Sequence, residues 1–243
     1  MKIKTNRHLI YALMIVLLIG ILYACNSASN EVQTKTVSDE TTTAEVTSTE
    51  INNTETESSE EIQTESILTD YDGNTYKSIQ VGDQVWMTEN FRSTHLGDGT
   101  PINYFECNGD SSNNAVYGLL YDLEAIIGLQ NTAPEGWHIP TESDWEELIN
   151  FLGSPKEAAE QIITSDYWSI STEIISPSGF NATPAGMHDF TGVFQWFGDA
   201  VVFASSTSDV NGVYYYIKAD NIELLKGNFH PSDAVSIRLI KDN

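Results

Sequence analysis

The stretch GWHIPTESDWEELINFLG, residues 136–153, holds the clearest helix signal in the chain. Thr141 is a typical N-cap residue, and Asp144 at the third helical position can complete a capping box. Apolar side chains then recur at the spacing of one buried helical face: Trp145, Leu148, Ile149 and Leu152. Because Gly153 ends this pattern and Pro155 prevents its continuation, we predict a helix between Thr141 and Gly153.

Two further helices are expected around this stretch. Immediately after it, Ser154, Pro155 and Glu157 supply an N-cap, a first-turn proline and a capping-box acid ahead of an apolar run. Upstream, residues 115–127 carry apolar side chains on one helical face, and Gly128 follows as an end signal. The sequence therefore predicts one helix that starts at Ser154 and another over 115–127.

Strand-like segments lie on both sides of the helical region. Residues 74–80 and 84–88 are rich in β-branched and aromatic side chains and are separated by the turn Gly82-Asp83. Four later segments have the same character, with turns at Asn211-Gly212 and Asp220-Asn221: 201–206, 213–218, 222–225 and 235–240. Helices in the middle and strands at both ends predict an α+β fold with a mostly antiparallel sheet and two to three helices.

The beginning of the chain resembles a bacterial lipoprotein signal. A cationic head is followed by an uncharged run of 16 residues, 9–24, and then by Cys25. The run is shorter than the roughly 20 residues that cross a bilayer. The resemblance implies that residues 1–24 are removed and that a lipid on Cys25 anchors the protein in a membrane. An uncleaved signal stays open, because Tyr23 stands where such signals usually carry a small residue.

The segment after Cys25 differs in composition from everything that follows. Residues 26–66 are mostly Thr, Ser, Glu and Asn, with ten acidic side chains against Lys35 and no aromatic residue. Such a segment cannot bury enough apolar surface to offset the entropy of ordering its backbone. We therefore predict a disordered spacer over residues 25–66, with one domain over 67–243.

The predicted domain is strongly acidic. Of 35 acidic and 11 basic residues in the chain, 10 and 4 fall in residues 1–66, which leaves 25 and 7, a net charge of −18. Its basic residues are scattered rather than clustered, so we exclude nucleic acid as a partner. If Cys25 is lipidated, Cys107 is left without a second cysteine, and the domain has no internal disulfide.

Short blocks spread over nearly all of residues 67–243 occur in a recognisable order. They are Asp72-Gly73-Asn74-Thr75-Tyr76, Trp86-Met87-Thr88-Glu89-Asn90-Phe91-Arg92, Tyr117-Gly118-Leu119-Leu120-Tyr121, Gly136-Trp137-His138-Ile139-Pro140-Thr141, Gly179-Phe180-Asn181-Ala182 with Pro184-Ala185-Gly186, and Ala204-Ser205-Ser206-Thr207. This series resembles the Fibrobacter succinogenes major paralogous domain, which is typically found on secreted or lipid-anchored bacterial proteins. The resemblance implies a C-type lectin-like fold, as in the formylglycine-generating enzymes.

No residue pattern indicates a reaction, a metal or a cofactor. The formylglycine-generating enzymes use two cysteines, whereas this domain has only Cys107. The histidines lie far apart in sequence without ligand spacing, and the segment that starts at Asp70 lacks the glycine and glutamate of a calcium loop. We therefore expect no metal site and no cofactor, and we interpret Asp72-Gly73-Asn74 as turn chemistry.

A candidate binding surface lies late in the domain, where C-type lectin-like folds place their variable ligand loops. The candidate residues are Trp196, Tyr214, Tyr215, Tyr216, Phe229 and His230. Because side chains alternate along a strand, Tyr214 and Tyr216 should share one face and Tyr215 the other. One face would be core and the other could contact a sugar or a protein. The alternative that all of these residues pack in the core stays open.

Three functions are compatible with these features. The first is a cell-surface lipoprotein that displays a non-catalytic binding or adhesion module for a glycan or a protein. The second is an enzyme that acts on envelope or extracellular polysaccharide, and the third is a structural component of the envelope. All three place the protein outside the cytoplasm, held by its lipid on the outer membrane or cell surface.

Overall fold

The computed structural model describes residues 67–164, 166–170, 176–206 and 212–242. The predicted signal, Cys25, the spacer and the turn residue Asn211 lie outside the described residues. The unit Glu60–Asn243 is compact by itself and carries three clusters of buried apolar side chains. Among the described residues, no helix is long and apolar enough to cross a membrane.

The predicted hairpin lies near the start of the domain, although its first strand begins at Ser78 rather than at residue 74. Strands β3 (Ser78–Val81) and β4 (Gln84–Met87) pair antiparallel around the turn at Gly82, which has a φ of +64°. The short strands β1 (Leu68–Thr69) and β2 (Thr75–Tyr76) precede them and pair with each other. A four-stranded sheet of order β3-β4-β13-β7 then joins the hairpin to β7 (Trp137–His138) and to the last strand, β13 (Ile240–Lys241).

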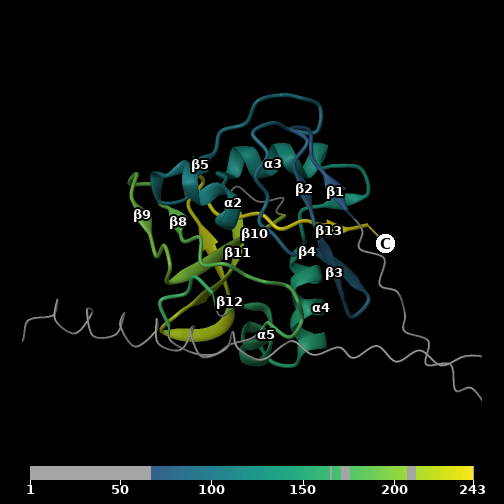
Figure 1. Ribbon diagram of the computed structural model, residues 1–243, viewed down its shortest axis with the longest axis vertical. Coiled ribbons are helices and arrows are strands. Elements are labelled where there is room, and N and C mark those ends of the chain that lie inside the picture. Colours follow the sequence, from purple (N-terminus) through teal and green to yellow (C-terminus); the bar gives the residue numbers. More distant parts are fainter. Residues whose placement is uncertain (1–66, 165, 171–175, 207–211, 243) are drawn as a thin grey trace, which may run out of the picture. The chain divides into compact units, whose positions relative to one another are not determined.

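A second sheet, of order β10-β11-β12, forms the centre of the domain (Figure 1). Its strands are β10 (Ala200–Ser205), β11 (Gly212–Lys218) and β12 (Asn221–Phe229), paired antiparallel throughout. The two later strands meet at the predicted turn, and their register shifts between Tyr216 and Lys218. Two short antiparallel strand pairs complete the strand inventory of the described residues: β5 (Phe105–Glu106) with β6 (Leu119–Leu120), and β8 (Met187–His188) with β9 (Phe194–Gln195).

The two capped helices are confirmed. Helix α4 (Glu142–Leu152) begins after a complete capping box formed by Thr141 and Asp144, and it ends at Gly153. Helix α5 (Pro155–Ile162) follows with a second capping box, formed by Ser154 and Glu157. These reciprocal hydrogen bonds satisfy backbone N–H groups that have no partner inside a helix, which is why such local signals predict helix starts so well.

The prediction of one helix over residues 115–127 is wrong. The chain forms the single-turn helix α2 (Asn114–Tyr117), then strand β6, and only afterwards helix α3 (Leu123–Thr132). The break falls at Gly118, whose φ is +71° and where an added Cβ would lie 2.8 Å from the carbonyl oxygen of Phe91. Close backbone contact with a distant segment, which helical spacing does not reveal, stops the helix there.

The predicted strand over residues 235–240 is only partly a strand. Val235 bridges Tyr121, Ser236 bridges Phe203, and a ladder forms only at β13. The segment is extended, but it passes from one partner segment to the next instead of pairing with a single neighbour. The fold is otherwise α+β with antiparallel sheets, as predicted; the described residues hold three helices of at least eight residues, α3, α4 and α5, besides α2.

The two faces of the central sheet bury different apolar clusters. On one face, Val201 and Phe203 pack with α4 and α5 around Trp145. On the opposite face, Val202 and Ala204 pack with α3, β6 and the chain end. Figure 1 shows α3 at one end of the domain and the α4–α5 pair at the other. Residues of the segment 235–240 contribute to both clusters, which ties the two layers together.

A fully buried cation, Arg238, links these layers. Its guanidinium donates to the side-chain oxygen of Asn90 at 2.6 Å and to the carbonyl oxygens of Met87, Phe180 and Asn181 at 3.0, 2.5 and 2.8 Å. The same group lies over the ring of Phe180, 4.8 Å from its centroid. Burial lowers the pKa of Arg238 to about 9, which is still above neutral pH, so the side chain remains a cation.

Replacing this cation should destabilise the whole domain. In Arg238→Met, the side-chain oxygen of Asn90 and three carbonyl oxygens lose a buried donor, which we expect to cost about 3 kcal/mol or more of unfolding free energy. The measurement is urea unfolding. Lys156→Met is the control, because that side chain is exposed and its ion pair with Glu160 contributes at most about 1 kcal/mol. Equal losses of unfolding free energy in the two variants would contradict the role of Arg238 in linking the two layers.

Candidate functional site

Three aromatic side chains form a partly exposed surface on the central sheet, which we call the aromatic row: Trp196, Tyr214 and Tyr216. Tyr214 and Tyr216 stand two residues apart on β11, with ring centroids 5.6 Å apart. Tyr214 pairs across the sheet with Gly227, and an added Cβ there would lie 2.9 Å from its ring. The glycine therefore leaves the space that the tyrosine ring occupies.

Trp196 reaches the same face from the turn between β9 and β10. It has a left-handed backbone, with a φ of +58°, which is uncommon for a large side chain. The backbone N–H groups of Asp199 and Ala200 both donate to the Trp196 carbonyl oxygen, at 2.8 and 2.9 Å, and hold the turn in place. This unusual conformation directs the indole toward the tyrosines of β11, where it packs partly exposed against the same apolar cluster.

Lys218 completes the surface. It follows Tyr216 by two residues on β11, and its ammonium lies 3.6 Å from the centroid of the Trp196 ring and 5.9 Å from that of Tyr216. These distances are in the range of cation–π contacts. Within the part of the chain that the structure describes, no carboxylate lies within 4.0 Å of this ammonium. The surface thus combines aromatic rings with one positive charge.

The other candidate residues do not join the row. Tyr215 points to the opposite face, as strand alternation predicts; its side chain is 2% exposed, and its ring stacks on Trp145 at 5.2 Å. Phe229 is buried and packs against Tyr214, with ring centroids 5.7 Å apart. His230 is exposed in the turn after β12, where its ring contacts Phe190 at 4.9 Å.

Sequence reasoning missed Lys218, although a signal for it existed. The alternation that separates Tyr215 from its neighbours also places Lys218 on the face of Tyr214 and Tyr216. Its contact with Trp196 could not be foreseen, because that residue comes from a turn 22 positions earlier whose backbone conformation is unusual.

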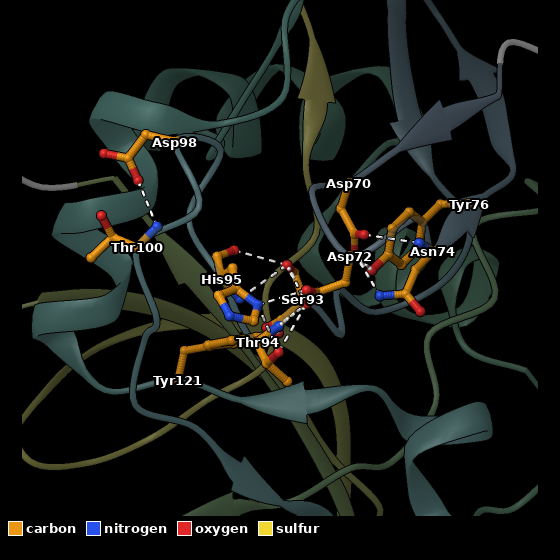
Figure 2. A network of polar contacts seen from close by, with 10 residues as sticks. All are labelled: Asp70, Asp72, Asn74, Tyr76, Ser93, Thr94, His95, Asp98, Thr100 and Tyr121. Atoms are coloured by element: carbon orange, nitrogen blue, oxygen red, sulfur yellow. Dashed lines mark hydrogen bonds and ion pairs between the residues drawn. The ribbon is translucent and has the colours of Figure 1, made fainter.

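The carboxylates of Asp70 and Asp72, in the segment that lacks the pattern of a calcium loop, accept hydrogen bonds from neighbouring protein groups (Figure 2). Asp70 accepts hydrogen bonds from the backbone and side chain of Asn74 and from the Tyr76 hydroxyl at 2.6 Å. Asp72 accepts from Ser93, from the backbone and hydroxyl of Thr94, and faces the Nδ1 atom of His95 at 2.6 Å. Asp70 therefore stabilises the β1–β2 turn itself, and Asp72 joins that turn to the segment after β4.

These contacts stabilise the ionised form of Asp72. Desolvation raises its pKa, but the hydrogen bonds from Thr94, His95 and Ser93 outweigh that effect and lower the pKa to about 2. Elsewhere, burial raises the pKa of the Cys107 thiol to about 12, so that group stays protonated. In the described ranges, no group of three or more His, Cys, Asp or Glu side chains is arranged to hold a metal ion.

The Asp72 network gives a defined dependence of stability on pH. Because the pKa of Asp72 in the folded protein is depressed below its ordinary value of 3.8, its contribution is complete above that value and is lost as the pH falls toward about 2. We expect Asp72→Asn to be less stable than the wild type near neutral pH, with the difference shrinking in acid. Unfolding free energies measured from pH 6 to about 2 test this. Asp83→Asn, in an exposed turn, is the control; a pH-independent difference for Asp72→Asn would contradict the prediction.

Comparison with known proteins gives one result. No curated protein and no solved structure matches the chain significantly. The family model of the Fibrobacter succinogenes major domain matches residues 79–241, which is more than half of the chain and runs from β3 to β13. The matched range contains Arg238 and the aromatic row together with Lys218. The chain therefore belongs to the Fibrobacter succinogenes major domain family.

Proposed function

We propose that this protein is a lipid-anchored protein of the cell envelope that displays a non-catalytic binding module. The observation that carries the proposal is the aromatic row with Lys218, a partly exposed surface on a rigid sheet. Aromatic rings supply a large contact area at a low cost in conformational entropy, and ligand sites combine such rings with a few polar groups. A glycan or a protein with a complementary surface would bind there.

Polar groups on the row suit recognition rather than reaction. Desolvation, together with Tyr216 and Asp233, raises the pKa of Tyr214, so its hydroxyl stays protonated and can donate a hydrogen bond at neutral pH. The Lys218 ammonium supplies a positive charge beside the rings. These groups can orient a ligand that the aromatic rings hold by contact.

The proposed location rests on the N-terminal sequence. Residues 1–24 resemble a lipoprotein signal, and the acidic spacer after Cys25 would hold the domain away from the membrane surface. The family resemblance supports the C-type lectin-like fold as a further part of this proposal. The position of β13 beside β4, which brings both ends of the domain into one sheet, is compatible with it.

The anchor can be tested by Cys25→Ser. The variant lacks the thiol that would carry the lipid, so we expect it to leave the membrane fraction while the domain stays folded. Cell fractionation measures the first result and protease resistance of residues 67–243 the second. Cys107→Ser is the matched control and should remain membrane-bound. Full membrane association of Cys25→Ser would contradict the lipoprotein proposal.

The binding surface can be tested on fragment 60–243, which contains all three hydrophobic clusters. We expect it to bind members of a combined glycan and extracellular-protein array, and Trp196→Asn to lose at least tenfold in affinity. Asparagine tolerates the left-handed backbone, so the change removes the ring at little conformational cost. Phe151→Asn, an exposed aromatic residue on α4, is the control. Equal binding by both variants, or turnover of an arrayed polymer, would contradict the proposal.

A further inference from the structure

Lys218 differs from the other cations of the domain. Arg92, Lys156 and Lys226 each contact a carboxylate: Glu89, Glu160 and Glu142. Arg238 is buried among carbonyl oxygens, and the remaining two cations, Lys77 and Lys241, are exposed. Arg238 and Lys218 both lie over two aromatic rings with no carboxylate within 4.0 Å in the described ranges, but Arg238 is fully buried, whereas Lys218 is partly exposed.

This arrangement is unexpected in a domain with 25 acidic residues, because carboxylates are abundant partners for a lysine. A contact with partly exposed aromatic rings stabilises an ammonium only weakly. An ammonium has three N–H donors, and an aromatic face occupies only the side that it covers. The ammonium is therefore held in one place by Trp196 and Tyr216 while it keeps donors for an additional anionic group.

The row beside this charge has the form of a saccharide site. Tyr214 and Tyr216 lie along one strand with ring centroids 5.6 Å apart and ring planes inclined by 57°, so each ring presents its own face to one sugar unit. Sugar rings present apolar C–H faces that pack on aromatic rings, and the Tyr214 hydroxyl can hydrogen-bond a sugar hydroxyl. The ammonium of Lys218 stands at the end of this row, next along the strand.

We propose that the aromatic row and Lys218 bind an acidic saccharide, with its sugar rings on Tyr214 and Tyr216 and its carboxylate or sulfate on the Lys218 ammonium. The inference rests on the proposed function and names its ligand class. The Lys218 ammonium complements a single acid group of the ligand, whereas the net charge of −18 repels polymers that carry many such groups. A saccharide with isolated acid groups fits this surface better than a nucleic acid or another densely charged polymer.

The test uses fragment 60–243 and matched tetrasaccharides of glucose, galactose and mannose. Each tetrasaccharide is prepared in a neutral form, with one terminal C6 carboxylate, and with one terminal C6 sulfate. Calorimetry measures the affinities. We expect at least one acidic form to bind about tenfold or more tightly than its neutral counterpart, since a hydrogen bond to a charged group contributes a factor of this order. The carboxylate and sulfate arms distinguish uronic acids from sulfated sugars.

Lysine variants assign the preference to one side chain. Lys218→Gln should lose the roughly tenfold preference for the acidic form, so that the acidic and neutral forms bind with similar affinities, and Lys218→Arg should retain part of the preference. Lys226→Gln is the control, because that ammonium contacts Glu142 on the opposite side of the sheet and should leave binding unchanged. Melting temperatures check that each variant is folded.

The outcomes separate this inference from the proposed function. Equal binding of acidic and neutral forms, or an acidic preference that survives in Lys218→Gln, overturns the acidic-saccharide assignment while the binding module stands. If no tetrasaccharide binds and Trp196→Asn still abolishes binding to an arrayed protein, the saccharide class is wrong and the binding function again stands. If neither array members nor tetrasaccharides bind, both proposals fail.

Discussion

The rest of the structure depends on the hydrogen bonds that the buried guanidinium of Arg238 donates. The guanidinium has no carboxylate partner within hydrogen-bonding distance among the described residues; one amide oxygen and three backbone carbonyl oxygens receive its hydrogen bonds instead. A charge in an apolar interior is tolerated only where such donors and acceptors are matched. The residues it joins come from the end of β4, from the segment at 180–181 and from the chain end, so a single side chain fixes three distant segments.

This arrangement determines where a ligand surface can exist. With the chain end held between the layers, one face of the central sheet is closed by α4 and α5 around Trp145. The opposite face packs on α3 and β6 but leaves Tyr214, Tyr216 and Trp196 partly exposed. A sheet that is buried firmly on one side is a rigid support for side chains on the other. The position of the proposed binding surface is thus a consequence of how the core is built.

Local signals predicted the elements whose causes are local. The capping boxes at Thr141 and Ser154 were sufficient to place α4 and α5, because both partners of each box lie within three residues. The helix expected over 115–127 failed because Gly118 contacts the backbone of Phe91, a segment nearly thirty residues away. The prediction of one strand over 235–240 is only partly right, again because distant contacts decide the outcome. The segment is extended, but its bridging partner changes from Tyr121 at Val235 to Phe203 at Ser236.

The sequence by itself determined the family, the α+β class, the two capped helices and the alternation that separates Tyr215 from Tyr214 and Tyr216. These features depend on residue types at short spacing, which a sequence displays directly. Only the tertiary structure decided that Lys218 contacts the Trp196 ring and that Phe229 is buried. It also decided that the Asp72 carboxylate forms hydrogen bonds with Thr94 and His95. Those contacts join segments far apart in the chain, and their geometry is set by packing around the core rather than by any local pattern.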